Sequence, residues 1–375
     1  AGLGSGLELV VPAQPQDLWV NVPVEEDFVL QSPWTLYKNG QGYQVKHESG
    51  DQISVRVPSE PTWYTQQTPG GTPMHRIGVL QGTYLGVYVS NSCMYWYAQE
   101  GAQNCKFCTT GFNVGVNEVT TKAVSDVVAT AKAAKEESGV TFVHLNTGYQ
   151  NGRGLEEVAP YVKALKEQLG VLVGVQVVPT DQMWKYDRML DLGADHFSFC
   201  YEFHNPAYFA KYLPGKEQTV GQKTFFDALE YTSAKMGKGR VSGEIIAGIE
   251  PLEDTHKAID YITGQGAFPT VCIFRPVIGS DLEHLPSPDP VAMEEVMRHM
   301  YQACMAHNIP TGLAPNIEVS LIVQPKDAQH LVEDGLAKKW YGLKNQVLKN
   351  LARPHFKKQL TAHPVPGTLE ALQSP

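Results

Sequence analysis

Hydrophobic and polar residues follow one pattern in the first eighty residues of the chain. Short runs, several of them alternating between apolar and polar residues, are separated there by Pro, Gly, Asn and Asp. These runs are ELVVP, DLWVNV, WTLYKN, YQVKHES and QISVRVP. A period of two is typical of half-buried β-strands, and the intervening residue types favour turns. We therefore predict a small β-rich module over residues 1–79.

A different pattern begins near residue 80, where apolar runs rich in β-branched residues alternate with longer segments that favour helices. The apolar runs are LGVYVSN, TFVHLNT, VLVGVQVV, HFSFCYE, RVSGEIIAG and PTVCIFRPV. Strands buried on both faces and separated by helices are typical of a parallel sheet. Six such units are fewer than the eight of a complete barrel. We therefore predict an α/β fold with a partial (β/α)6 barrel over residues 80–325.

The last part of the chain favours helices again. The segment at 327–354 predicts one or two helices, and the final residues predict a tail, so residues 326–375 form a helical extension. No apolar run approaches the roughly 20 residues that a membrane span requires. The first residues, AGLGSG, are interpreted as a processed end rather than an intact signal peptide. We expect no membrane span.

Composition and charge narrow the class of protein. The chain has 375 residues, of which 42% are hydrophobic and 18% charged, as in an ordinary soluble enzyme. Its net charge of −9 argues against a nucleic-acid surface, which needs a basic field. Six cysteines are too few for a disulfide scaffold, and Cys200, Cys272 and Cys304 lie in apolar stretches where buried thiols are expected. We expect a reduced, cytoplasmic protein.

The other three cysteines lie close together, in the stretch NSCMYWYAQEGAQNCKFCTTG at 91–111. Cys105 and Cys108 form a C-x-x-C pair, and Cys93 precedes Cys105 by eleven intervening residues. The stretch follows the first predicted barrel strand. In βα barrels the loops at the carboxyl ends of the strands carry the chemistry. This loop is therefore the first candidate for a functional site.

Several kinds of site could use three grouped thiols. Structural zinc needs four ligands, and no second Cys or His pair follows, although His75 could supply a fourth. A redox C-x-x-C pair would not explain Cys93 or the aromatic Phe107. Inert core thiols do not suit a loop rich in Gly, Asn and Gln. A [4Fe–4S] cluster fits better, because three thiolates leave one iron open to a second molecule.

The arrangement resembles the radical S-adenosylmethionine (radical SAM) superfamily. Its usual signature is C-x3-C-x2-C after the first strand, with an aromatic residue before the third cysteine. Here the second half of the signature is intact with Phe107, and the first gap is eleven residues, giving C-x11-C-x2-C. The resemblance implies that Cys93, Cys105 and Cys108 bind a [4Fe–4S] cluster, and that the open iron binds S-adenosylmethionine.

Further positions carry the resemblance. The run HLNTGYQ takes the place of a Gly-Gly-Glu-like turn that receives the methionine amino group, which implies a contact at Thr147 and Gly148. After the fourth strand, Glu-x-x-Asn-Pro resembles the branch of biotin synthase and the [FeFe]-hydrogenase maturase, and implies that Glu202 contacts the cofactor. The run GEIIAGIE resembles the fifth-strand motif beside adenine and includes Ile245. The helix arginine that pairs with the cofactor carboxylate in the family is Ala228 here, and Arg240 or Lys223 is the substitute that we expect.

Two further groups are candidates from their own chemistry. Tyr201 and His204 flank a strand end and are predicted to face the substrate, with a structural hydrogen-bond cluster as the alternative. Arg275, near the end of the sixth strand, is costly to bury unpaired, so it meets an internal carboxylate or grips an anionic substrate or cofactor.

The resemblance implies a radical SAM lyase, synthase or transferase. Such an enzyme cleaves S-adenosylmethionine reductively and uses the 5′-deoxyadenosyl radical on a small molecule in cofactor or metabolite biosynthesis, by rearrangement, bond cleavage or group insertion. The electron donor would be of the flavodoxin or ferredoxin type. The alternative is a non-radical iron–sulfur or zinc-binding barrel that binds a small ligand. No nucleic-acid partner is expected.

Overall fold

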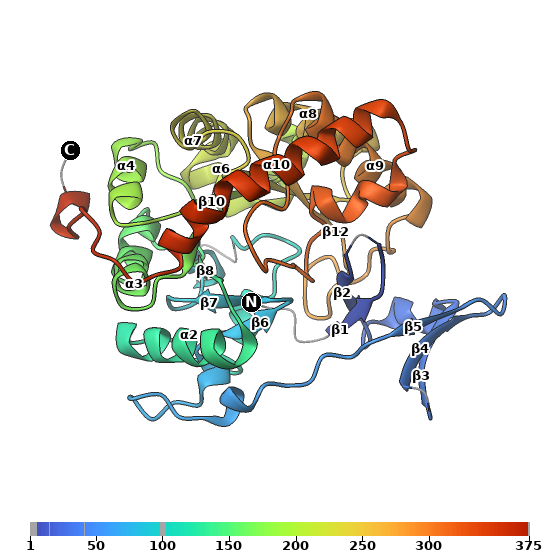
Figure 1. Cartoon of the computed structure of the whole chain (residues 1–375), viewed down its shortest axis with the longest axis horizontal. Coiled ribbons are helices and arrows are strands. Elements are labelled where there is room, and N and C mark those ends of the chain that lie inside the picture. Colours follow the sequence, from blue (N-terminus) through green and yellow to red (C-terminus); the bar gives the residue numbers. More distant parts are fainter. Residues whose placement is uncertain (1–5, 15, 41, 98–102, 374–375) are drawn as a thin grey trace.

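The main sheet has seven strands that follow one another in chain order. The computed structural model describes residues 6–14, 16–40, 42–97 and 103–373 (Figure 1). Six strands are parallel, and the first, β6, pairs antiparallel with its neighbour. The strands are β6 (Val79–Gln81), β7 (Tyr84–Tyr88), β8 (Phe142–Asn146), β9 (Leu172–Gln176), β10 (His196–Glu202), β11 (Val241–Ala247) and β12 (Phe268–Ile273). Each parallel strand lies within one of the six predicted runs or overlaps it.

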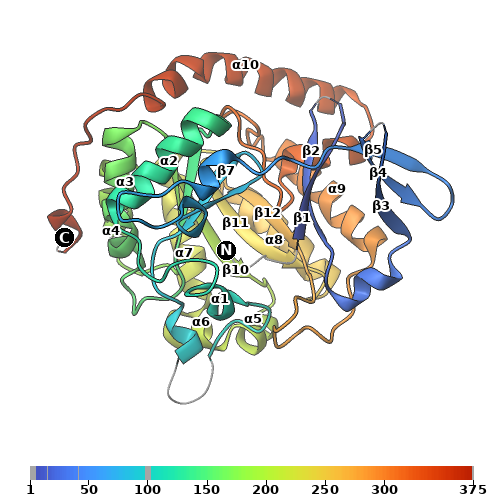
Figure 2. The same ribbon diagram turned by 90° about the horizontal axis from the view of Figure 1, so that it is seen from below.

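Helices connect these strands and surround the curled sheet, as Figure 2 shows. The longer ones are α2 (Val124–Ser138), α3 (Gly154–Gln168), α4 (Trp184–Asp191), α7 (Gly221–Met236), α8 (Leu252–Gly264) and α9 (Pro290–Ala306). Three short helices, α1 (Thr110–Asn113), α5 (Pro206–Tyr212) and α6 (Pro214–Thr219), lie in loops at the carboxyl ends of strands. The predicted partial (β/α)6 barrel is confirmed.

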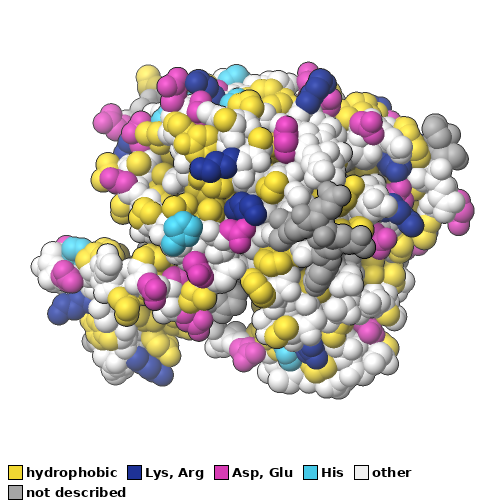
Figure 3. Space-filling model, turned by 180° about the vertical axis from the view of Figure 1, so that it is seen from behind, with side chains coloured by type: hydrophobic (Ala, Val, Ile, Leu, Met, Phe, Trp, Pro, Cys, Tyr) yellow, Lys and Arg dark blue, Asp and Glu magenta, His cyan; other side chains and the backbone are white. Residues whose placement is uncertain are grey.

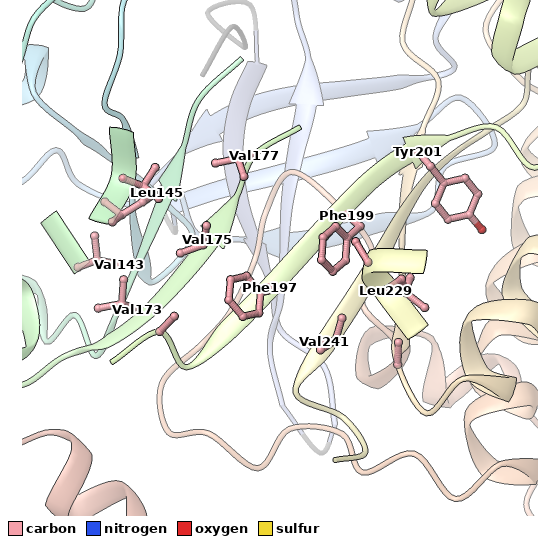
Figure 4. Close-up of a cluster of buried hydrophobic side chains, with 14 of the residues drawn as sticks. Val143, Leu145, Val173, Val175, Val177, Phe197, Phe199, Tyr201, Leu229 and Val241 are labelled. Atoms are coloured by element: carbon pink, nitrogen blue, oxygen red, sulfur yellow. The ribbon is translucent and has the colours of Figure 1, made fainter. Parts of the chain in front are cut away.

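The core lies between the outer face of the sheet and these helices. Figure 4 shows side chains from alternate positions of three neighbouring strands, together with Leu229 of α7. Val143, Val173, Phe197 and Phe199 are all at most 1% exposed. Because side chains alternate across a strand, the positions between them point the other way, into the lumen of the barrel.

The first eighty residues form two small antiparallel sheets, as predicted. One pairs β1 (Gly6–Val11) with β2 (Leu18–Pro23), and the other joins β3 (Trp34–Asn39), β4 (Gly42–His47) and β5 (Gln52–Val55). The β3–β5 sheet projects from the body of the molecule, as Figure 3 shows. The β1–β2 ribbon lies on the barrel, where the amide of Asn21 donates to the Ser320 carbonyl oxygen at 2.9 Å.

The C-terminal extension contains a short 3-10 helix, η5 (Pro325–Leu331), and one long helix, α10 (Leu336–Gln359). Figure 2 shows α10 running along the outer edge of the molecule. Just before η5, Val323 pairs with Val271 of the last barrel strand. Within the described part of the chain, no helix combines the length and the apolar character needed to cross a membrane.

Candidate functional site

The three grouped cysteines lie in the loop between β7 and α2, at the carboxyl ends of the parallel strands. Cys93 comes five residues after β7, and Cys108 comes just before α1. The amide of Cys108 donates to the carbonyl oxygen of Cys105 at 2.9 Å, which closes a tight turn around Lys106 and Phe107. Residues 98–102, part of the enlarged gap after Cys93, lie outside the described residues.

The turn after β8 packs directly against Cys93. The amide of Tyr149 donates to the Cys93 sulfur at 3.2 Å, and the amide of Gly148 donates to the Tyr88 hydroxyl at 2.8 Å. A β-carbon added to Gly148 would lie 2.4 Å from the β-carbon of Cys93, so only glycine allows this approach. The hydroxyls of Thr147 and Ser90 are hydrogen-bonded beside it. Thr147 and Gly148 are thus brought together with the cysteine loop.

Burial affects the protonation of two of the three thiols. Burial raises the pKa of both Cys93 and Cys105, and the nearby Cys108 adds to the rise. A coordinating metal deprotonates such a thiol outright. Within the described residues, no three His, Cys, Asp or Glu side chains converge on the position of one metal ion. In a [4Fe–4S] cluster each thiolate binds a different iron, so the three neighbouring thiols fit this group.

His75 lies in the 3-10 helix η3 (Met74–Arg76) and is exposed. Its Nδ1 lies 2.9 Å from the carbonyl oxygen of Tyr64. The structure therefore gives this imidazole a backbone partner and does not place it in a ligand group with the cysteines.

Glu202 ends β10 in an unusual conformation. Its φ is +58°, in the left-handed region, and the pairing with β11 shifts register between Cys200 and Glu202. A bulge of this kind re-aims a side chain. The Glu202 carboxylate consequently receives the ammonium group of Lys216, whose Nζ lies 2.7 Å from both carboxylate oxygens and 2.6 Å from the Cys200 carbonyl oxygen. Burial raises the pKa of Glu202 to about 7 although Lys216 opposes the rise.

Lys216 is a site residue that the sequence reasoning missed. It lies on the short helix α6 and is 7% exposed, and its charge also acts on Cys93 and Cys105. The exposed Lys211, on the helix before it, lies over the ring of Tyr212 instead. The only signal in the sequence was a lysine in a turn-forming Pro-Gly-Lys segment, which does not say how far the side chain reaches.

A cavity of about 640 Å³ runs through the lumen of the barrel. At the carboxyl end of the strands it is lined by Phe107, Glu202 and Arg275, and at the other end by Ala352 and Phe356 of α10. Its volume is within the range of small-molecule sites in enzymes. Phe107, between two of the cysteines, connects the cysteine loop with this cavity.

The lumen wall mixes polar side chains with apolar ones such as Phe142, Leu172 and Ile246. Residues at alternate positions of successive strands line it, among them His144, Gln176, Ser198, Ser242, Glu244 and Thr270. The amide Nε2 of Gln176 donates to the sulfur of Cys200 at 2.6 Å, and the Cys200 thiol donates to Glu244 at 3.2 Å. Burial raises the pKa of Glu244. The strands are therefore not apolar on both faces, contrary to the prediction.

This wall also corrects the prediction for two cysteines. Cys200 contacts Glu244, and Cys272 lines the cavity, so both are half-buried thiols of the lumen. Cys304 is fully buried in the core, as predicted.

Arg275 follows β12 and lines the cavity. Its Nη2 donates to the carbonyl oxygen of Asn21 at 2.7 Å and to the Asn21 side-chain oxygen at 3.0 Å. Its Nη1 is buried and has no hydrogen-bond partner among the described residues. The N-terminal ribbon thus holds one side of the guanidinium. The charge of Glu26, a buried carboxylate of the N-terminal segment, also acts on Arg275, in line with the predicted alternative of an internal carboxylate.

The structure does not bring Arg240 and Ile245 to the cysteines. Arg240 precedes β11, so it lies at the amino ends of the parallel strands, opposite the cysteine loop. Ile245 lies on the same side of β11 as Gly243, where an added β-carbon would meet Ile262 and Leu229. Ile245 therefore faces the helices, whereas its neighbours Glu244 and Ile246 line the cavity.

Tyr201 and His204 also lie outside the lumen. Tyr201 is fully buried, and its ring lies 5.1 Å from that of Phe226 on α7. The ring of His204 packs against Phe226 and Tyr261 at 5.6 Å and 5.8 Å. Neither residue lines the cavity. The side chains were expected to face the substrate, and the structure places them between the sheet and its helices.

Asn205 and Glu250, which belong to the quoted motifs, organise the same loop. The Asn205 side chain caps α5 by accepting from the amide of Ala207 at 3.0 Å, with Pro206 in the first turn. Glu250 accepts from the amides of His204 and Asn205, each at 2.9 Å. Both residues therefore hold the loop after β10 in place.

Comparisons with known proteins give distant similarities. No protein-family model matches the chain. Bacteriochlorophyllide c C-7(1)-hydroxylase of Chlorobaculum limnaeum is 22% identical over 290 residues, which cover 70% of either protein. SuiB of Streptococcus suis, solved with S-adenosylmethionine bound, aligns with a TM-score of 0.45 and 11% identity over 61% of this chain.

A third similarity is to TsrM of Kitasatospora setae, a radical S-adenosylmethionine methyltransferase solved with cobalamin and a [4Fe–4S] cluster. It aligns over 84% of this chain and 72% of its own, with 11% identity and a TM-score of 0.40. The alignment with SuiB spans 50% of SuiB's length. The chain is thus similar to all three proteins only at low sequence identity.

Proposed function

We propose that this protein is a radical SAM enzyme that binds a [4Fe–4S] cluster through Cys93, Cys105 and Cys108. The observation that carries the proposal is the packing of the cysteine loop on the Thr147–Gly148 turn, at the carboxyl end of a partial barrel. The distant similarity to a hydroxylase of bacteriochlorophyllide c supports a biosynthetic role.

When bound, the cluster and S-adenosylmethionine would supply an electron and a 5′-deoxyadenosyl radical that takes hydrogen from the substrate. The chain's own residues would bind and orient the cluster and the cofactor. The three thiolates would hold the cluster, and the carbonyl oxygens of Thr147 and Gly148 would accept from the methionine amino group of the cofactor. The amides of both residues and the Thr147 hydroxyl already have partners within the protein. A carboxylate has about four acceptor sites, so Glu202, although paired with Lys216, can still accept from a hydroxyl or ammonium group.

The substrate would be a small molecule with an extended body and an acidic group. The cavity of about 640 Å³ is large enough for such a body. Arg275 lines this cavity, and guanidinium geometry is well matched to a carboxylate of the substrate. We propose that the substrate belongs to cofactor or pigment biosynthesis. The electron for the cluster would come from a flavodoxin- or ferredoxin-type donor that docks at the cysteine end.

Anaerobic reconstitution with iron and sulfide tests the proposal. Wild type should bind about four irons per chain, as a [4Fe–4S] cluster requires, and form 5′-deoxyadenosine from S-adenosylmethionine with dithionite. Cys93→Ala, Cys105→Ala and Cys108→Ala should each lose the product. Cys304→Ala, a buried cysteine outside the loop, is the matched control and should retain it.

A non-radical iron–sulfur or zinc-binding barrel is the second candidate. It shares the three thiols, so metal analysis alone does not separate the two. Iron loading without 5′-deoxyadenosine, or zinc in place of iron, would contradict the radical SAM proposal. Full activity of Cys93→Ala would show that another residue supplies the third ligand.

A further inference from the structure

The long helix α10 leaves a stripe of apolar side chains uncovered. Leu336, Trp340, Leu343, Val347 and Leu351 follow one another at intervals of three or four residues, so they lie along one side of the helix. Leu336 is 77% exposed, Trp340 69% and Leu351 71%. We call these five residues the α10 stripe. A stripe this long on a helix is unusual for a surface that faces only water.

The opposite side of α10 packs on the barrel, which shows that the helix itself is held in place. Tyr341, Leu348, Ala352 and Phe356 repeat at helical intervals and are buried or half-buried. The hydroxyl of Tyr341 donates to the carbonyl oxygen of Ile309 at 2.6 Å. The helix therefore has two rows of apolar residues. The inner row packs on the barrel, and the α10 stripe is not covered by any of the described residues.

The charge of α10 contrasts with that of the whole chain. The chain carries 39 acidic residues and a net charge of −9, but α10 contains no Asp or Glu. Its seven cationic side chains are Lys338, Lys339, Lys344, Lys349, Arg353, Lys357 and Lys358. On the face of the molecule seen in Figure 3, by comparison, Lys and Arg are scattered among Asp and Glu. Among the described residues, only Lys338 of these seven forms an ion pair, with Asp334.

We propose that α10 docks on a membrane surface rich in anionic lipid, with the α10 stripe inserted among the acyl chains and the lysines at the headgroups. A basic helix with Trp and Leu on its apolar side is the kind that lies in the interface. Long lysine side chains can keep their ammonium groups at the headgroups while the stem lies along apolar groups. The inference goes beyond the proposed function and does not depend on the cluster.

Two other occupants fit the observations less well. A second copy of the chain would bring two uncompensated sets of seven cations face to face. An acidic electron donor would match the charge, but α10 reaches the cavity at the end opposite the cysteines. There Phe356 lines the cavity near Arg240 and Lys238, at the amino ends of the strands. The charge and the apolar stripe together favour lipid.

Vesicle sedimentation with the full chain tests the proposal. The protein should bind vesicles of phosphatidylcholine with phosphatidylglycerol, and bind vesicles of phosphatidylcholine alone much more weakly. Leu343→Glu/Val347→Glu should lower the partition coefficient about tenfold or more. Lys339→Gln/Lys357→Gln should lower it about thirtyfold at low salt, because each basic residue near an anionic surface contributes about a factor of five.

A matched control changes exposed apolar residues elsewhere. Leu30→Glu/Val291→Glu also replaces one leucine and one valine by glutamate, at positions 88% and 75% exposed. It should bind vesicles almost as wild type does, apart from the small effect of net charge. A blue shift of tryptophan fluorescence on binding, lost in Trp340→Phe, would locate the contact on α10.

Three results would overturn the proposal. They are equal binding to neutral and anionic vesicles, an equal loss in the α10 and the control double variants, and no binding at all by a folded wild-type chain. Light scattering of the same samples without lipid adds a fourth. A dimer that Leu343→Glu/Val347→Glu dissociates would assign the α10 stripe to a second copy.

Discussion

The two faces of the six parallel strands differ in the burial and polarity of their side chains. On the outer face Val143, Val173, Phe197 and Phe199 are closed off by helices (Figure 4). On the lumen face the intervening positions include most of the polar residues of these strands and line a cavity. A shift of one residue along a strand exchanges the two environments. One set of positions therefore holds the fold together, and the other is free to bind.

At the end of β10, two adjacent residues lie on opposite faces of the sheet. Tyr201 points outward to Phe226, and the next residue, Glu202, points to Lys216 at the cavity. Alternation along the strand sets this change of direction, and the register shift and left-handed φ of Glu202 occur at the same point. Stability and binding should therefore respond very differently to substitutions at neighbouring positions.

The largest effect is expected at Phe199. Phe199→Ala removes a ring that is 1% exposed and should lower the free energy of unfolding by about 3–5 kcal/mol. Its lumen neighbour Ser198 accepts from the Ser242 hydroxyl at 3.0 Å, so Ser198→Ala should cost only about 1 kcal/mol. Urea titrations of both variants measure the difference. Equal losses of stability would contradict the view that the outer face contributes more to stability than the lumen face.

The second effect concerns the pair at the carboxyl end of the lumen. Lys216→Met leaves Glu202 buried without its partner and should lower the free energy of unfolding by about 3 kcal/mol at pH 8. Burial raises the pKa of Glu202 to about 7 against the opposing charge of Lys216, so removal of Lys216 lets this pKa rise further. Glu202 therefore protonates more readily in the variant as the pH falls, and the loss should shrink at pH 6. Lys216→Met/Glu202→Gln should recover much of the loss.

The exposed pair Lys223–Asp227 provides the matched control. Lys223 is 83% exposed, so Lys223→Met should change stability by less than about 0.5 kcal/mol at either pH. A loss in Lys216→Met that is no larger than this, or that does not depend on pH, would mean that the Glu202–Lys216 pair is solvated.

The fold was predictable because its signals are local. Alternating runs indicated the five N-terminal strands, and each barrel strand is a compact apolar run between helical segments. The same runs also contain the polar residues that line the lumen. His144, Gln176, Ser198 and Glu244 each lie between apolar neighbours within their run. Reading the strands as apolar on both faces concealed that pattern. A period of two inside an otherwise apolar run was the available signal.

The site was predictable only in part, because its remaining features are not local. The cysteine loop and the Thr147–Gly148 turn were placed by the position of strand ends, which a parallel sheet fixes. Lys216 reaches Glu202 across two short helices whose path no periodicity reveals. The register shift with β11 between Cys200 and Glu202 is also not local, because it depends on the pairing of two strands.

A smaller effect should appear in the pH dependence of stability. Burial, followed by the charge of His196, lowers the pKa of His144 to about 3. Between that value and 6.5 the unfolded chain binds a proton that the folded chain does not, so stability falls as the pH falls below 6.5. His144→Gln should remove up to about 2 kcal/mol of the decrease between pH 7 and pH 5. An unchanged profile would show that His144 is hydrated in the lumen.

The smallest effect is expected on the outer face, at Tyr201. Its hydroxyl is buried and has no hydrogen-bond partner among the described residues. Tyr201→Phe removes only that group and should leave stability unchanged or raise it by about 1 kcal/mol, since an unpaired buried polar group is costly. Because the ring faces Phe226 rather than the cavity, the yield of 5′-deoxyadenosine and the affinity for S-adenosylmethionine should match wild type. Glu202→Gln, one residue away and facing the lumen, should weaken that affinity about tenfold or more, the usual scale for a hydrogen bond to a charged group. Isothermal titration of both reconstituted variants decides between the faces. A loss of affinity in Tyr201→Phe with none in Glu202→Gln would place the cofactor on the wrong side of this strand.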